Sequence, residues 1–219
     1  MSAVESTRRR VEAVVFDFGE TLIDETREWS WRADRAGVPR LTFLAVLGAL
    51  IRDGRPFQEV FDVLGVPRPG SGSGAERATL ATGLRADDLY PDARPCLEEL
   101  RRLGLRVGIA ANQPDRAAEI LATVGVELDL IATSAAWGVE KPSPAFFDRI
   151  TTELALPAGA IAYVGDRVDN DVSPAAAAGM TAVFLRRGPW AWIQCPVGTP
   201  DGASFVISDL TALPDLLRP

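Results

Sequence analysis

Charged and amide side chains stand at the ends of several short apolar runs in this chain. Three such runs are each followed directly by a polar residue: Asp17, Asn112 and Asp166. Another run, from Leu128 to Ala132, precedes Lys141 at a greater distance. Asp171 comes shortly after Asp166. Carboxylate oxygens are preferred ligands of hard divalent cations. An ammonium group is a compact charge that can neutralise a phosphoryl oxygen or a carboxylate nucleophile. The residue types therefore indicate chemistry on an anionic group.

Lys141 is the only lysine of the chain, since the other 22 of the 23 basic residues are arginines. Such arginine-rich usage indicates a GC-rich genome. A lysine that persists under that bias suggests a position where the broader guanidinium group of arginine would not serve. We therefore count Lys141 among the candidate catalytic residues.

The chain contains no histidine. This absence excludes Ser-His-Asp catalysis, Cys-His catalysis and zinc sites with histidine ligands. Proton transfer must then be carried by carboxylates, lysine, tyrosine, cysteine or water.

Apolar runs and helical patterns must position these residues. Strands are expected at 11–17, 105–111, 128–132, 160–165, 181–185 and 204–207, and helices at 93–103, 114–124, 143–154, 171–178 and 209–217. This alternation predicts an α/β fold, a three-layer Rossmann-like core with a parallel sheet. The carboxyl ends of parallel strands share one edge, where ligands bind. The polar residues should therefore meet there.

The alternation is interrupted between Thr26 and Asp88. Helical patterns near 28–37 and 41–52 lead to residues 56–64, and a Gly-, Ser- and Pro-rich stretch at 67–74 comes before a further helical pattern near 75–84. We expect residues 25–89 to form an inserted small helical cap, and residues 1–24 plus 90–219 to form the catalytic core.

Composition limits the possible partners. The 219 residues carry a formal charge of −7, which disfavours nucleic acid and anionic membranes as partners. Two cysteines cannot form a disulfide framework, and the first residues contain no apolar signal-peptide core. No apolar run is long enough to span a membrane. These features predict a soluble cytoplasmic protein, either a monomer or a homodimer.

Four motifs in order are similar to those of the haloacid dehalogenase-like superfamily, which consists mostly of phosphatases. The family's first motif is Asp-x-Asp-x-Thr after a strand, the second a strand ending in Ser or Thr, the third a Lys and the fourth Gly-Asp with a further Asp. The corresponding stretches here are Asp17–Leu22, Gly108–Asn112, Val139–Pro144 and Val164–Asp171. The resemblance spans residues 11–187 and places the insert where the family has its cap.

This resemblance implies a mechanism. Asp17 would attack phosphorus and form an aspartyl-phosphate that water then hydrolyses. Mg²⁺ would be the cofactor, held by Asp17, the main-chain carbonyl of Gly19, and Asp166. Asp171 would orient metal-bound waters or hold Lys141, which would neutralise charge on Asp17 and the phosphoryl group. Asn112 and Lys141 would bind the phosphoryl group of a small phosphorylated substrate.

Two positions depart from the family pattern. The family's second aspartate, its general acid and base, is Gly19 here, and the hydroxyl residue of the second motif is Ala111. Glu20, one position further, is a possible replacement for the lost acid and base. General acid-base catalysis is worth about 10²–10⁴ in rate. The sequence thus predicts a preference for activated leaving groups, which depart with less protonation.

Three functions are compatible with these residues: a phosphatase, a catalytically weak or inactive relative that binds phosphate or a partner, and a metal-free dehalogenase. The acidic cluster at 166–171 argues against the dehalogenase, because metal-free members lack it. Metal dependence would separate the first function from the third. Turnover of an activated aryl phosphate would separate the first from the second.

The insert should choose the substrate. Aromatic and cationic residues gather near its start, where they could line a pocket or simply pack: Trp29, Trp31, Arg32 and Arg35. Trp190 and Trp192 follow the strand at 181–185, and could cover a hydrophobic edge or form a dimer contact. The sequence does not decide between these roles.

Overall fold

The computed structural model describes residues 10–68, 85–114 and 125–218. Within them lies a sheet of six parallel strands in the order β3-β2-β1-β4-β5-β6. The strands are β1 (Ala13–Phe16), β2 (Arg106–Ala111), β3 (Leu130–Thr133), β4 (Ile161–Gly165), β5 (Thr181–Leu185) and β6 (Phe205–Ile207). The predicted α/β class is thus confirmed.

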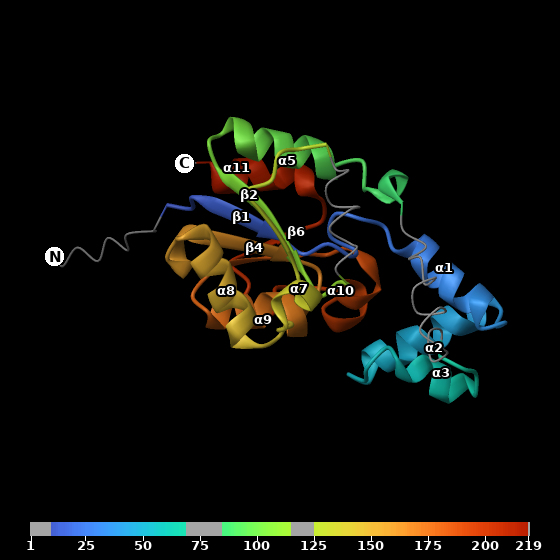
Figure 1. Cartoon of the computed structure of the whole chain (residues 1–219). Coiled ribbons are helices and arrows are strands. Elements are labelled where there is room, and N and C mark those ends of the chain that lie inside the picture. The colour runs from blue at the N-terminus through green and yellow to red at the C-terminus, as the bar shows by residue number, and fades with distance from the viewer. Residues whose placement is uncertain (1–9, 69–84, 115–124, 219) are drawn as a thin grey trace.

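Helices cover both faces of this sheet (Figure 1). The helices of the described ranges are α1 (Thr26–Arg35), α2 (Arg40–Arg52), α3 (Glu59–Leu64), α5 (Ala93–Arg102), α7 (Ser134–Trp137), α8 (Pro144–Leu154), α9 (Ser173–Ala177), α10 (Gly188–Gln194) and α11 (Leu213–Leu217). Short turns of 3₁₀ helix occur at η1 (Ala86–Asp88), η2 (Ala158–Ala160) and η4 (Leu210–Ala212), and a π-helical turn at η3 (Val168–Val172).

Side chains of β1 alternate between two cores. Val14 and Phe16 pack in the layer that contains α5 and α11, whereas Ala13 and Val15 pack in the layer that contains α8 and α9. Every residue of β1 is buried, as expected for a central strand covered on both faces. The strand that precedes Asp17 is therefore held rigidly.

The chain runs outward from β1 to β3 and then returns to place β4 on the other side of β1. This reversal creates a switch point between β1 and β4, where open α/β sheets bind ligands. Phe16 pairs with Val164 in the register of these strands, so Asp17 and Asp166 emerge side by side from their ends.

Helices α1, α2 and α3 stand beside the sheet and have a hydrophobic cluster of their own (Figure 1). Phe43, Leu47 and Phe61 lie in that cluster, and Trp190 of α10 joins it from the core. The described strands all lie outside residues 25–89. The division into residues 1–24 plus 90–219 and residues 25–89 remains a proposal.

Most predicted elements agree with the structure within two or three residues, but three details differ. Ser143 lies at the N-cap of α8 without a capping hydrogen bond from its side chain, so Pro144 is the effective start signal. The helix expected at 171–178 is preceded by the π-helical turn η3, and α10 was not expected at all. The helical pattern at 75–84, all but the first residue of the helix expected at 114–124, and most of the 67–74 stretch lie outside the described residues. In the parts of the chain that are described, no helix has the length and apolarity to cross a membrane.

Candidate active site

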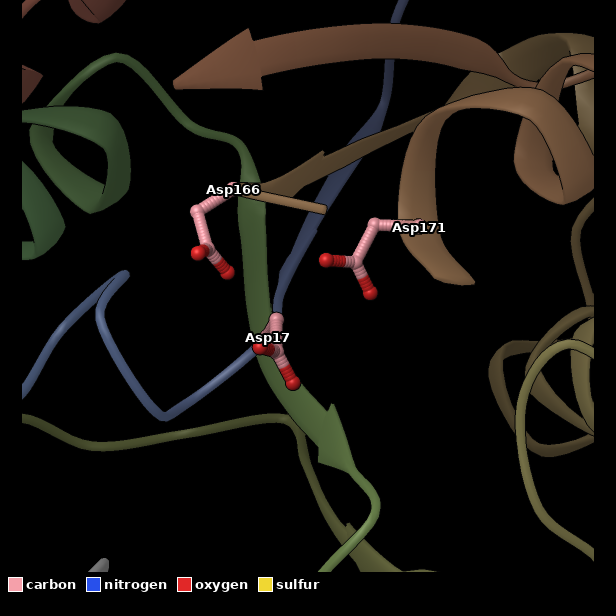
Figure 2. A group of neighbouring side chains, drawn as sticks. All are labelled: Asp17, Asp166 and Asp171. Carbon is pink, nitrogen blue, oxygen red and sulfur yellow. The ribbon is translucent and has the colours of Figure 1, made fainter. Parts of the chain in front are cut away.

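Three carboxylates converge at the ends of β1 and β4. Ligand oxygens of Asp17, Asp166 and Asp171 all lie within 4.8 Å of one another. Figure 2 shows the three side chains close to one another, with the carboxyl groups of Asp166 and Asp171 turned toward each other. The predicted meeting of these residues at one sheet edge is what the structure shows, and such a cluster could hold a metal ion.

Gly165 makes the approach of Asp171 possible. A Cβ atom at position 165 would lie 2.4 Å from the Asp171 carboxyl carbon, closer than real Cβ contacts allow. The backbone N–H groups of Asp171 and Val172 both donate to the Arg167 carbonyl, at 2.9 and 3.1 Å. This wide turn directs the Asp171 side chain back toward the strand end at Gly165. Turns of the π-helical type are frequent at functional sites.

Lys141 links two of the three carboxylates. Its Nζ lies 2.7 Å from Asp17 Oδ1 and 2.5 Å from Asp171 Oδ1, and the residue is only 2% exposed. Burial lowers the pKa of Lys141, but the adjacent Asp17 and Asp171 charges outweigh it and raise the pKa well above its usual value. Lys141 therefore carries a fixed positive charge at the predicted nucleophile.

Asn112 holds the backbone of Lys141 at two points. Its Nδ2 donates to the Lys141 carbonyl at 2.9 Å, and its Oδ1 accepts from the Lys141 N–H at 2.8 Å. The side chain predicted to bind phosphate is thus engaged in positioning the lysine loop. Phosphate binding by Asn112 remains a prediction, and the positioning role was not anticipated.

Negative charge is concentrated in this cluster. Burial, followed by repulsion from Asp171 and Asp17, raises the pKa of Asp166 well above its usual range. Burial is also the main cause that raises the pKa of Asp171 to about 6. Asp166 Oδ2 is buried and finds no hydrogen-bond partner among the described residues. A carboxylate oxygen without a partner, beside two further carboxylates, is suited to a hard divalent cation.

Glu20 is buried and already bonded at both oxygens. Its Oε1 accepts from the Glu25 N–H at 3.2 Å, and its Oε2 accepts from the Tyr90 hydroxyl at 2.7 Å. Burial raises its pKa, although the bond from Tyr90 opposes this change. Glu20 adopts a left-handed φ of 53°, which turns the chain between Asp17 and α1. These contacts stabilise the loop between Asp17 and α1. The acid-base role of Glu20 remains a prediction.

Gly19 faces a different glutamate. A Cβ atom at position 19 would lie 2.4 Å from Glu25 Oε1 and 2.7 Å from the Glu25 carboxyl carbon. Burial, together with the charges of Glu20 and Asp17, raises the pKa of Glu25 to about 8. Glu25 was not singled out in the sequence, because only the folded path of the loop brings it back to Gly19.

A cavity of about 710 Å³ joins the carboxylate cluster to the helical insert. Core residues Asp17, Lys141 and Asp166 line it together with insert residues such as Trp29 and Arg32. Arg32 stacks over the Trp29 ring at 5.1 Å and pairs with Glu28 at 2.8 Å. Of the four insert residues suggested from the sequence, only these two are among the lining residues.

Trp190 connects the core to the insert. Its ring centroid lies 5.7 Å from that of Trp29, and Arg167 stacks over it at 5.3 Å. Trp190 is 8% exposed, whereas Trp192 is 58% exposed. Trp190 is thus buried against the helices of residues 25–89, and the two roles suggested from the sequence, covering a hydrophobic edge or forming a dimer contact, remain predictions.

Comparison with known proteins identifies the family. A model of haloacid dehalogenase-like hydrolases matches residues 11–179. The chain belongs to this family. The match covers the segments that carry Asp17, Lys141, Asp166 and Asp171. The predicted resemblance to a phosphatase-like member of the superfamily is thereby confirmed.

Several phosphatases are similar to this family member. The glyceraldehyde 3-phosphate phosphatase of Methanopyrus kandleri is 33% identical over 132 residues, which cover 59% of this chain and 56% of that protein. The phosphoserine phosphatase of Thermus thermophilus is 31% identical over 185 residues, 81% of this chain and 70% of that protein. The chain thus spans just over half the length of the first of these relatives.

The fold is shared with solved structures of the superfamily. The HAD phosphatase of Thermococcus onnurineus has a TM-score of 0.64 at 23% identity, with 95% of this chain and 100% of that chain covered. This likeness supports the three-layer α/β fold.

Proposed function

We propose that this chain is a Mg²⁺-dependent hydrolase of a small phosphorylated metabolite that acts through an aspartyl-phosphate on Asp17. The observation that carries the proposal is the contact of Asp17 with the buried Lys141, beside two further carboxylates whose oxygens lie within 4.8 Å. An ionised carboxylate needs no base to become a nucleophile.

The donor set fits Mg²⁺. Asp17, Asp166 and the main-chain carbonyl of Gly19 would hold the ion, with Asp171 orienting its waters or holding Lys141. The partnerless Asp166 Oδ2 supports this assignment, because a buried carboxylate oxygen without a donor is costly. When bound, Mg²⁺ would reduce the repulsion between an anionic nucleophile and an anionic phosphate.

The chain's own residues perform the remaining tasks. The Lys141 ammonium group lies against Asp17 Oδ1. It can stabilise the negative charge of the phosphoryl group as the bond between Asp17 and phosphorus forms. Asn112 fixes the backbone of Lys141, so the ammonium group need not reorganise during the reaction. This preorganisation is what electrostatic stabilisation of a transition state requires.

The substrate is proposed to be small and anionic. A volume of about 710 Å³ suits a small metabolite rather than a polymer. Arg32 and Arg55 line the cavity from the insert side and offset the overall charge of −7 around an anion. Relatives named for glyceraldehyde 3-phosphate and phosphoserine agree with this size class. We propose residues 25–89 as the cap that selects among such compounds.

The preference for activated leaving groups depends on the missing side chain at Gly19. It holds only if no other carboxyl group takes over proton transfer. A second candidate function, an inactive protein that binds phosphate, is favoured by the same glycine and by Ala111, which lacks the hydroxyl group of the family. A cytoplasmic location and a monomeric or homodimeric state remain predictions.

Release of inorganic phosphate from an aryl phosphate, with Mg²⁺ and with EDTA, tests the proposal. Wild type should turn over the substrate only with Mg²⁺, and Asp17→Asn should abolish turnover while it keeps the fold. If wild type binds inorganic phosphate but releases none from any substrate, the binding function replaces the enzyme.

A further inference from the structure

The carboxyl group of Glu25 occupies the space into which a side chain at position 19 would project. A Cβ atom built on Gly19 would meet Glu25 Oε1 at 2.4 Å, the carboxyl carbon at 2.7 Å and Oε2 at 3.1 Å. Both residues line the same cavity as Asp17. A glycine at position 19 thus leaves room for a carboxyl group that arrives from another part of the chain.

The start of α1 delivers this carboxyl group. Glu25 is the N-cap residue of α1, and the Trp29 N–H donates to its carbonyl at 2.9 Å. Glu20 Oε1 accepts from the Glu25 N–H at 3.2 Å, and Tyr90 in turn anchors Glu20. The backbone of Glu25 is therefore fixed at both ends while its side chain turns back to Gly19.

The Glu25 carboxyl group itself takes no part in the hydrogen bonds that hold its backbone. Among the residues that the structure describes, none forms a hydrogen bond with its two oxygens, although Glu20 and Asp17 lie near enough to influence its charge. A carboxyl group with no hydrogen-bond partner in the described part of the chain, in the cavity that Asp17 also lines, remains available to a substrate or to water.

On the basis of the proposed function, we propose that Glu25 is the proton donor and acceptor of this enzyme, replacing the carboxyl group that Gly19 lacks. In the first step Asp17 forms a bond to phosphorus, the bond to the leaving oxygen breaks, and Glu25 gives its proton to that oxygen. In the second step Glu25 takes a proton from water as the water oxygen attacks phosphorus. The bond between phosphorus and Asp17 then breaks, which restores both carboxyl groups.

This assignment changes the expected substrate range. An alkyl phosphate needs protonation of its leaving oxygen, whereas an aryl phosphate departs with little help. With Glu25 in place, wild type should hydrolyse alkyl phosphates as well as aryl phosphates. The activated-substrate preference predicted from Gly19 should appear only when Glu25 is removed.

Glu25→Gln tests the assignment with little change of shape. We expect kcat/KM for an alkyl phosphate to fall about 10²–10⁴-fold, and kcat/KM for an aryl phosphate to fall far less. The phosphoenzyme trapped by acid quench should increase, because the second step has lost its base. Glu153→Gln, in an exposed pair with Arg149 on α8, is the matched control and should change none of these values.

A double variant moves the carboxyl group back to position 19. The φ of Gly19 lies outside the left-handed region, so its backbone accepts an aspartate once Glu25 is shortened. Gly19→Asp combined with Glu25→Ala should recover alkyl phosphate turnover at least tenfold over Glu25→Ala alone. Gly19→Asp alone should raise alkyl phosphate turnover less, because the carboxyl groups of Asp at position 19 and of Glu25 would compete for one space.

The outcomes separate this inference from the proposed function. If wild type and Asp17→Asn are equally inactive toward both phosphates with Mg²⁺, the proposed function fails and the role of Glu25 falls with it. If wild type is active but Glu25→Gln lowers kcat/KM for the alkyl and the aryl phosphate equally, and no phosphoenzyme accumulates, the role of Glu25 is only structural. Failure of a folded double variant, with an unchanged unfolding temperature, to recover alkyl turnover would also overturn the assignment.

Discussion

Asn112 clamps the backbone of Lys141 with both ends of its amide group, at 2.9 Å to the carbonyl and 2.8 Å from the N–H. The clamp joins the end of β2 to the loop before α8, two segments 29 positions apart in the chain. It explains how the long side chain of Lys141 is held against Asp17.

Replacing Asn112 by Asp should test this clamp. The variant keeps an acceptor for the Lys141 N–H but loses the donor to the carbonyl, and it adds a charge near two carboxylates. A displacement of Lys141 by about 1 Å could lower kcat roughly 10²-fold. Measured kcat and KM for an aryl phosphate should show the loss mainly in kcat. A rise in KM at constant kcat would instead support direct phosphate binding by Asn112.

Lys141→Met should destabilise the protein strongly in the absence of metal. The change leaves Asp17 and the fully buried Asp171 without their counter-ion. Removal of one partner of a buried ion pair costs about 3–5 kcal/mol. Urea unfolding with EDTA present measures the effect.

The matched control is Arg149→Met, which breaks an exposed pair with Glu153. Such surface pairs contribute about 1 kcal/mol or less. Equal losses in the two variants would show that the buried contacts of Lys141 are not important for stability.

Mg²⁺ should raise the unfolding temperature of wild type. A ligand that binds only the folded state at 100 times its Kd stabilises it by about 2.7 kcal/mol, which for a chain of this size is several degrees. Asp166→Asn should remove most of this shift, because it deletes the carboxylate whose Oδ2 has no described partner. Asp215→Asn, at an exposed position of α11, should keep the shift. A full shift in Asp166→Asn would contradict the metal assignment.

Much of the scaffold could be predicted from local patterns. The strand ends that carry Asp17 and Asp166 follow from short apolar runs bounded by polar residues, and the parallel sheet brings them together. The boundaries of β5 at Thr181–Leu185 agree with the sequence pattern. These features depend on short-range hydrophobic patterning, which a single sequence contains.

Other parts depend on contacts that no local pattern contains. Glu25 reaches Gly19 because Glu20 turns the chain at a left-handed φ and then bonds to the Glu25 N–H. The packing of Trp190 on Trp29 joins segments more than 150 residues apart. The wide turn at η3 differs from a helix that begins at Asp171, and its only sequence signal is Gly165, whose missing Cβ admits the Asp171 carboxyl group.

The two cysteines should differ sharply in reactivity. Burial, aided by Asp92, raises the pKa of the Cys96 thiol to about 12, while Cys195 is half-buried. The thiolate is the reactive form, so native Cys96 should stay unmodified from pH 7 to 9. An aromatic disulfide reagent should label one thiol per native chain and two after unfolding. Rapid labelling of Cys96 in the native protein would contradict its burial.

The same pKa shift has a defined effect on stability. Because the folded-state pKa of Cys96 lies above the reference value of 9.0, the folded chain keeps a proton that the unfolded chain loses as pH rises above 9. Stability from this group is therefore full below pH 9 and declines toward pH 12. Cys96→Ala should flatten this part of the curve of unfolding free energy against pH.

Gly165→Ala should disrupt the active site by displacing the Asp171 side chain. The added Cβ would lie 2.4 Å from the carboxyl carbon and 2.5 Å from the Cβ of Asp171, so Asp171 must move. Its bond to Lys141 would then lengthen, and overpacking of this kind costs about 1–3 kcal/mol. We expect a lower unfolding temperature, a weaker Mg²⁺ shift and a large loss of kcat.

Gly48→Ala in α2 is the control, because its Cβ would only touch Ile193 at 3.7 Å. Since alanine favours a helix over glycine by about 0.5–1 kcal/mol, this control should be slightly stabilised and fully active. Equal activity of the two variants would mean that the close approach of Asp171 is not needed for catalysis.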